Sequence, residues 1–242
     1  MAFGGHWSPR TNCHDPPSWA RRGALDLSPL LLSLEVALLA TALASVLGIG
    51  VGAALRRRRS WTSDLIDAIT AAPLVLPPTV LGYYLLLLLG RRSPLGQAYE
   101  AATGQSLVFT FAGAVVAATV GALPLVIRSA RAALESVDPS FVAAARTLGA
   151  SPLKALLLIE LPLARRGLTA GVILGFARAL GDFGITLVVA GNLPGETQTA
   201  PLAIYDAIQA GRDQDAQGLA LILTAVAVVV LIGVQRLSGR RP

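Results

Sequence analysis

The sequence predicts an all-α polytopic membrane protein with five transmembrane helices, and two observations support this fold class. Of the 242 residues, 54% are apolar and only 14% are charged, with a mean hydropathy of +0.63, whereas a soluble domain usually has about 25% charged residues. The deficit is confined to five windows, 28–55, 65–89, 107–127, 168–190 and 218–235, whose only charged residues are Glu35, Asp67, Arg178 and Asp182. This alternation excludes a soluble globule, a disordered chain and a coiled coil.

Each window is long enough to cross a membrane as a helix. About 20 helical residues span a hydrocarbon core of roughly 30 Å. Backbone N–H and C=O groups in lipid must form their hydrogen bonds within the protein, so a membrane-spanning chain forms either helices or a closed β-barrel. A barrel would show alternating strands of about ten residues, whereas the unbroken apolar runs 85–89 and 225–232 favour helices.

The distribution of basic residues predicts the orientation. Thirteen lie in the connections after the first and third windows and after the fifth, and six lie on the opposite side. The thirteen are Arg56, Arg57, Arg58, Arg59, Arg128, Arg131, Arg146, Lys154, Arg165, Arg166, Arg236, Arg240 and Arg241, and the six are Arg10, Arg21, Arg22, Arg91, Arg92 and Arg212. The positive-inside rule then places the N-terminus outside the cytoplasmic (inner) membrane and the C-terminus in the cytoplasm, although Arg21 and Arg22 oppose this orientation. The basic residues gather on no single face, so we expect no nucleic-acid partner.

The two ends of the chain are predicted to be tails. Residues 1–27 should form a disordered extracytoplasmic tail, and residues 237–242 a short cytoplasmic one, on either side of a membrane domain at 28–236. The N-terminal segment Cys13-His14-Asp15, with His6 upstream, contains metal-ligand residue types without any recognised spacing, so we expect no metal site there. The first apolar window is too long for the core of a signal peptide and should be an uncleaved span.

The long connection from Arg128 to Gly167 is predicted to contain a pair of short helices at 138–162. Asp138 and Pro139 are typical of a helix start, and Gly149 of a helix end. A second helix should run from Ser151 to Pro162, because apolar residues recur there at helical spacing. From this pattern alone, the pair is either a docking element or an amphipathic segment that lies on lipid.

A resemblance favours the docking element. The run Ala143-Ala144-Ala145-Arg146-Thr147-Leu148-Gly149, followed after nine residues by Ile159-Glu160-Leu161-Pro162, resembles the EAA loop of type I ABC-importer permeases. Gly149, Ile159, Leu161 and Pro162 are in register, whereas Ala143 stands where the family has glutamate. The resemblance implies a MetI-like permease fold. It also implies that Ala143, Ala144, Ala145, Leu148 and Gly149 lie in a coupling loop that docks on a cytoplasmic ATPase.

Two further stretches, 73–84 and 175–199, are similar to the molybdate permease branch of that family. This similarity implies a homodimer that receives molybdate from a periplasmic or lipid-anchored binding protein and is driven by an ABC ATPase dimer, which uses ATP and Mg. Sulfate, thiosulfate or tungstate remains the alternative substrate, and Asp182 stands where both branches usually have glutamate. The chain has no phosphate-binding loop of the Gly-x4-Gly-Lys-Ser/Thr type. We therefore expect a transport subunit that is not itself an enzyme and binds no cofactor.

Prolines predict a broken helix in the second window. Pro73, Pro77 and Pro78 remove backbone donors within six positions, and buried helices tolerate such a break only against a neighbour or a wet cavity. The break either lines a translocation path or forms a gate or hinge, or it is only a packed kink.

Two of the four charges within the windows should form an ion pair. Arg178 lies about 15 Å into the fourth window at 1.5 Å per residue, and Asp182 follows one helical turn later. A structural pair that fixes helix packing is favoured over contact of Arg178 with a passing oxyanion, because a partner is within reach. Glu35 and Asp67 are expected to reach the interfaces, and we assign them no role.

Two other function classes fit the sequence less well. An ion-driven secondary transporter predicts inverted repeats with paired broken helices, whereas the sequence shows a single break. A membrane enzyme needs a catalytic His, Cys or nucleophile motif in or beside the spans, and the sequence has none.

Overall fold

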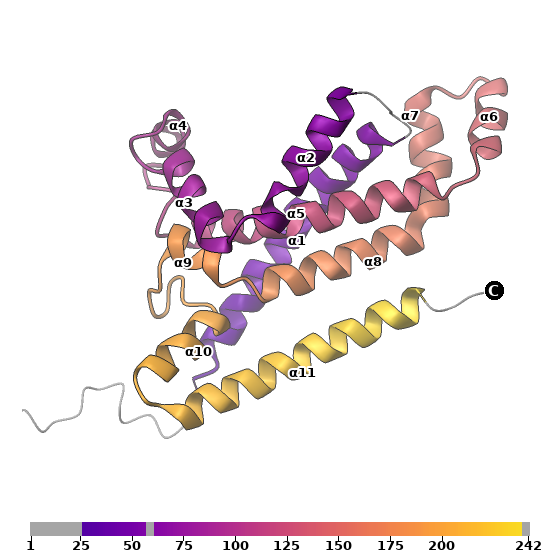
Figure 1. Ribbon diagram of the computed structural model, residues 1–242. Coiled ribbons are helices and arrows are strands. Elements are labelled where there is room, and N and C mark those ends of the chain that lie inside the picture. The colour runs from indigo at the N-terminus through magenta and orange to yellow at the C-terminus, as the bar shows by residue number, and fades with distance from the viewer. Residues whose placement is uncertain (1–25, 57–60, 239–242) are drawn as a thin grey trace, which may run out of the picture.

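The computed structural model describes residues 26–56 and 61–238, and within these ranges the regular structure is entirely helical. The helices, in order, are α1 (Ser28–Leu55), α2 (Trp61–Val75), α3 (Pro78–Leu89), α4 (Pro94–Thr103), α5 (Phe111–Glu135), α6 (Pro139–Thr147), α7 (Pro152–Ala155), the π-helix η2 (Leu156–Glu160), α8 (Leu161–Leu180), α9 (Gly184–Ala190), α10 (Ala200–Gln209) and α11 (Asp213–Ser238). Figure 1 shows this arrangement.

Helix α5 is the centre of the molecule, and α1 and α8 pack along it. The buried residues at this contact are mostly small, with Ala37, Ala40 and Ala44 on α1 facing Ala114, Ala118 and Ala122 on α5. At Gly48 a Cβ atom would lie 2.8 Å from the side chain of Val126. Small side chains let two helix backbones approach closely, which is how helices associate in lipid, where no hydrophobic effect drives them together.

Within the described ranges, three helices are long and apolar enough to cross a membrane alone: α1, α5, and residues Asp213–Val230 of α11. Two further pairs pass the same test only as bent units. Leu65–Val75 and Pro78–Leu89 are bent by 116°, and Pro152–Leu180 and Gly184–Ala190 by 60°. Five spans therefore result only if each bent pair counts as one span.

The second bend was not predicted. The sequence indicated one break, at the prolines of the second window, and a regular helix over 168–190. Instead, α8 ends at Leu180 and α9 begins at Gly184. The helix is interrupted in both bent pairs, so the prediction of a single break was wrong.

The central helix is also longer at its C-terminal end than predicted. The third window ended at residue 127, but α5 continues to Glu135. Arg128 and Arg131 therefore lie on a helix and not in a loop. The extra residues are rich in Ala, Leu, Arg and Glu, all of which favour helix.

The two ends of the molecule carry different elements. Helices α6 and α7 and the C-terminal end of α11 lie at one end, whereas α4, α9 and α10 lie toward the other (Figure 1). The side of the membrane on which each end lies stays a prediction. The predicted N-terminal tail up to residue 25, with Cys13 and His14, lies outside the described residues, as do Arg57, Arg58, Arg59 and residues 239–242.

Candidate functional site: coupling segment and buried ion pairs

The predicted elbow is present in residues 138–162, which we call the coupling segment. Asp138 begins α6, and its carboxylate accepts a hydrogen bond of 2.8 Å from the Ser140 N–H, which lowers the pKa of Asp138. At the other end, Gly149 has φ +86°. The N–H groups of Gly149 and Ala150 donate to Arg146 and Ala145 at 3.1 and 3.0 Å. This pair of bonds is the Schellman motif, which uses a glycine in left-handed geometry to end a helix.

The residues expected in the coupling loop divide by exposure. Ala143, Ala144, Leu148 and Gly149 are exposed, and 89% of the surface of Leu148 is accessible. Ala145 is buried, as is Ala155 of α7. Helix α6 and its C-cap residue therefore present small residues and two large apolar side chains, Phe141 and Leu148, outward, while Ala145 is buried.

The sequence predicts that the second arm ends at Pro162, but in the structure the helix continues past this residue. Helix α7 passes through the π-turn η2 directly into α8, and Pro162 lies in the first turn of α8. The Leu161 N–H donates to Leu156, five residues back, so the turn here is wider than an α-helical turn. A proline normally stops a helix because its ring clashes with the carbonyl four residues earlier, and a local π-turn accommodates it.

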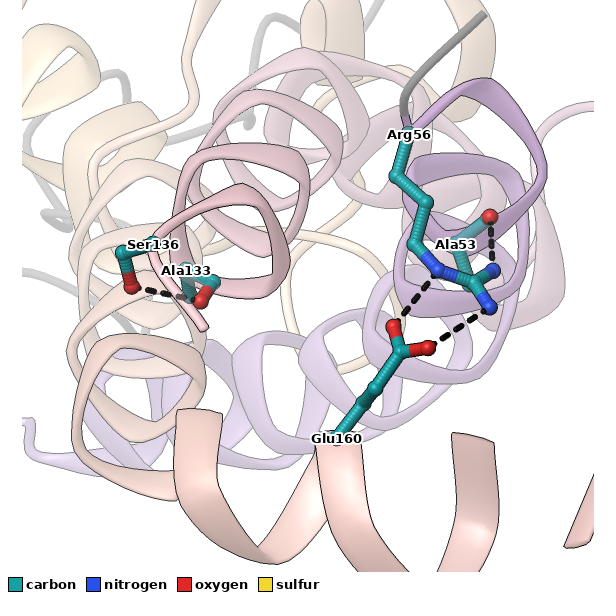
Figure 2. A network of polar contacts seen from close by, with 5 residues as sticks. All are labelled: Ala53, Arg56, Ala133, Ser136 and Glu160. Atoms are coloured by element: carbon teal, nitrogen blue, oxygen red, sulfur yellow. Dashed lines mark hydrogen bonds and ion pairs between the residues drawn. The ribbon is translucent and has the colours of Figure 1, made fainter. Parts of the chain in front are cut away.

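The coupling segment also contains a charged residue to which the sequence analysis gave no role. Glu160 is only 1% exposed, and its carboxylate contacts Arg56 at the end of α1, with Nε 2.7 Å from Oε2 (Figure 2). The sequence analysis predicts no partner for Arg56, which there contributes only to the predicted orientation. A signal was available in the sequence, since Glu160 is the single charge in the apolar run 156–163.

The proline break lies against the second break. Pro73 is inside α2, Pro77 precedes α3 and Pro78 begins it. At Gly184, the first residue of α9, a Cβ atom would lie 2.7 Å from the Pro78 side chain. Helices α3 and α9 continue side by side from this point, so the two interrupted pairs meet where both change direction.

The Arg178–Asp182 ion pair is present, with Nη1 2.9 Å from Oδ1. Asp182 is 3% exposed and lies in the break after α8, not on the same helix as expected. Its other oxygen accepts from the N–H and hydroxyl of Thr186 at 3.0 and 2.7 Å. Asp182 thereby joins the end of α8 to the first turn of α9, which agrees with a structural role. The Arg178 side chain remains 28% exposed.

A further ion pair involves Asp67, which was expected to reach the interface and was assigned no role. Asp67 on α2 contacts Arg131 on α5, and Arg131 also contacts Glu135 at 2.8 Å. These residues line a cavity of about 250 Å³ between α2 and α5. The pair therefore connects the first arm of a broken helix to the central helix.

Asp67→Asn is expected to lower the free energy of unfolding by less than about 1 kcal/mol, because partly exposed ion pairs contribute little. Both side chains keep 25% or more of their surface accessible, and Arg131 retains Glu135. Thermal unfolding of the purified variant measures the change. A loss of several kcal/mol would contradict this estimate.

Comparison with known proteins identifies the family of the chain. Residues 44–241 match the family described as "Binding-protein-dependent transport system inner membrane component". The chain is 40% identical over 217 residues to the molybdenum transport system permease protein ModB of Haemophilus influenzae, covering 89% of this chain and 95% of that protein. It is 42% identical to ModB of Escherichia coli K12, covering 84% and 89%. The sulfate transport system permease protein CysT of Salmonella typhimurium is 31% identical, covering 92% and 82%.

Solved structures agree on the fold. The inward-facing MetNI methionine ABC transporter superposes with a TM-score of 0.68 at 18% identity, covering 88% of this chain and 94% of that chain. A structure of an amino acid ABC transporter with histidines gives a TM-score of 0.61, also at 18% identity, covering 89% and 93%. With this fold and a family match over most of its length, the chain belongs to the inner-membrane components of binding-protein-dependent transport systems.

Proposed function

We propose that this chain is the membrane-spanning subunit of an ABC importer for molybdate. The observation that carries the proposal is its 39 to 42% identity to molybdenum permeases of several bacteria over at least 84% of its length. Sulfate permease is the second candidate, and its lower identity of 31% makes it the less favoured one.

The coupling segment supports energy input from a separate ATPase. The exposed residues Ala143, Ala144, Leu148 and Gly149 form the docking surface in this proposal, and Ile159, Leu161 and Pro162 connect it to α8. The chain itself has no phosphate-binding loop, so ATP and Mg belong to the partner ATPase dimer. A binding protein delivers the oxyanion at the opposite, outer end.

The path itself is proposed to lie between two copies of the chain. Helix α11 is mostly exposed in the single chain, as are Tyr83, Tyr84 and Leu87 on α3, which leaves apolar surface for lipid and a second subunit. In this arrangement α3 and α9, which meet at the breaks, are the gate elements, and Pro73, Pro77 and Pro78 define the bend. The N-terminus is outside and the C-terminus in the cytoplasm.

Uptake of labelled molybdate tests this function. A strain lacking the gene is expected to lose uptake, and the plasmid-borne gene is expected to restore it. Unlabelled molybdate and tungstate should compete, and a tenfold excess of sulfate should not. Loss of sulfate uptake alone in the deletion strain would assign the chain to the sulfate branch instead.

A further inference from the structure

Arg56 and Glu160, which are 104 residues apart in sequence, form a bidentate ion pair. Arg56 Nε lies 2.7 Å from Oε2 and Nη2 lies 3.2 Å from Oε1, while Nη1 donates to the carbonyl of Ala53 (Figure 2). The backbone N–H of Arg56 donates to Gly52 at 3.0 Å. The guanidinium is therefore fixed to the last turn of α1 on one side and to η2 on the other. Bidentate contacts of arginine with a carboxylate fix the relative orientation of the two side chains as well as the distance between them.

The carboxylate of this pair is buried, whereas the Arg56 side chain keeps 20% of its surface accessible. A cluster of apolar side chains from α1, α5, η2 and α8 lies in the same region. It consists of Ala53, Ala133, Leu134, Val137 and Ala164, with Leu156, Leu161 and Leu168 packed against them. Because Glu160 is 1% exposed, its charge depends on Arg56 for compensation.

The main chain departs from α-helical geometry at the same point. The π-turn η2 ends at Glu160, and Pro162 has no N–H with which to continue the hydrogen-bond ladder. Helices bend at π-turns and prolines, and π-turns recur at functional sites. The backbone route from α6 and α7 into α8 therefore passes through a deformable turn.

We propose that the Arg56–Glu160 pair is the joint that transmits movement of the coupling segment to α1, and this inference rests on the proposed ABC-importer function. The deformable turn allows the coupling segment to tilt relative to α8. The ion pair makes α1 follow that tilt, because it holds the last residue of η2 to the end of α1. Since α1 packs along both α5 and α8, its movement reaches the core of the subunit. Arg56 and Glu160 are thus positioning residues that contact neither ATP nor the transported anion.

The test compares molybdate uptake with ATP hydrolysis in the same proteoliposomes, which contain the permease with its ATPase and binding protein. Glu160→Gln keeps the size of the side chain and removes its charge. We expect the number of anions transported per ATP to fall at least tenfold in the recovered complex. A Glu160→Gln complex that is less abundant or less stable but has a wild-type ratio would overturn the proposal, because a purely structural pair would behave in that way.

A second variant decides the case in which Glu160→Gln does not assemble. Arg56→Lys keeps the positive charge but cannot make the bidentate contact. The number of anions transported per ATP should fall at least threefold in this variant. An unchanged number of anions transported per ATP in this variant would also overturn the proposal.

Glu100→Gln is the matched control. It removes the Arg91–Glu100 pair, whose atoms are 3.5 Å apart and whose side chains are exposed, on α4 far from the coupling segment. Its transport ratio should equal that of the wild type, and an equal loss there would overturn the proposal. Failure of the wild-type complex to transport molybdate would instead overturn the proposed function, and with it the inference.

Discussion

Gly149→Val is expected to reduce molybdate uptake at least tenfold while membrane insertion and yield remain at the wild-type level. Gly149 has φ +86°, a conformation that costs an L-residue about 1–2 kcal/mol and is least suited to a β-branched one. Apart from Gly149 and its two neighbours in the chain, no heavy atom of the described residues lies within 4 Å of the position its Cβ would take, so the effect comes from the backbone and not from a clash. Relief of this strain opens the two hydrogen bonds that end α6 and displaces α6 from α7. Uptake measured per unit of membrane-inserted permease reports the effect.

Gly104→Val is the matched control for this prediction. Gly104 also ends a helix, α4, with φ +74° and open space around its Cβ position. The substitution therefore imposes similar backbone strain at the end of the molecule away from the coupling segment (Figure 1). We expect uptake near that of the wild type. Equal loss in both variants, or normal uptake in Gly149→Val, would show that the elbow does not couple the ATPase to transport.

The sequence predicted those features whose signal is local. The first apolar window coincides with α1, and Asp138 and Gly149 cap α6 as expected. The prolines of the second window interrupt the helix, because a missing N–H acts at its own position. The contact between Arg178 and Asp182 was also predictable, since the two residues are only four positions apart.

Features that depend on distant partners were not predicted. Glu160 and Arg56 are 104 positions apart, and Asp67 and Arg131 are 64 apart, so the pattern shows the charges without showing which of them meet. The break after Leu180 has no proline to mark it. There, the packing of Gly184 on Pro78 and the three hydrogen bonds to Asp182 favour a new helix in another direction over continuation of α8.

Asp182→Asn is expected to lower the free energy of unfolding of the assembled permease by about 3 kcal/mol, at the lower end of the range for breaking a buried ion pair. The amide oxygen still accepts from Thr186, but the amide group cannot neutralise Arg178. The guanidinium lies close to Gly121 on α5, where a Cβ atom would be 3.3 Å from Nη2. An unpaired charge is therefore left against the central helix. Thermal unfolding of the purified complex, compared with that of Asp67→Asn, measures the loss.

The double variant Arg178→Met with Asp182→Asn separates the structural role from direct contact with the anion. Both charges are absent, yet the amide oxygen at position 182 still joins the break to Thr186, and a long apolar side chain occupies the space beside Gly121. Removing both charges leaves no unpaired buried charge, so the double variant should be more stable than Asp182→Asn alone. If the pair only holds α8 and α9 in place, uptake per folded complex returns with that stability. A stable double variant without uptake would assign Arg178 to the translocation path, because only a role toward the anion requires the positive charge itself.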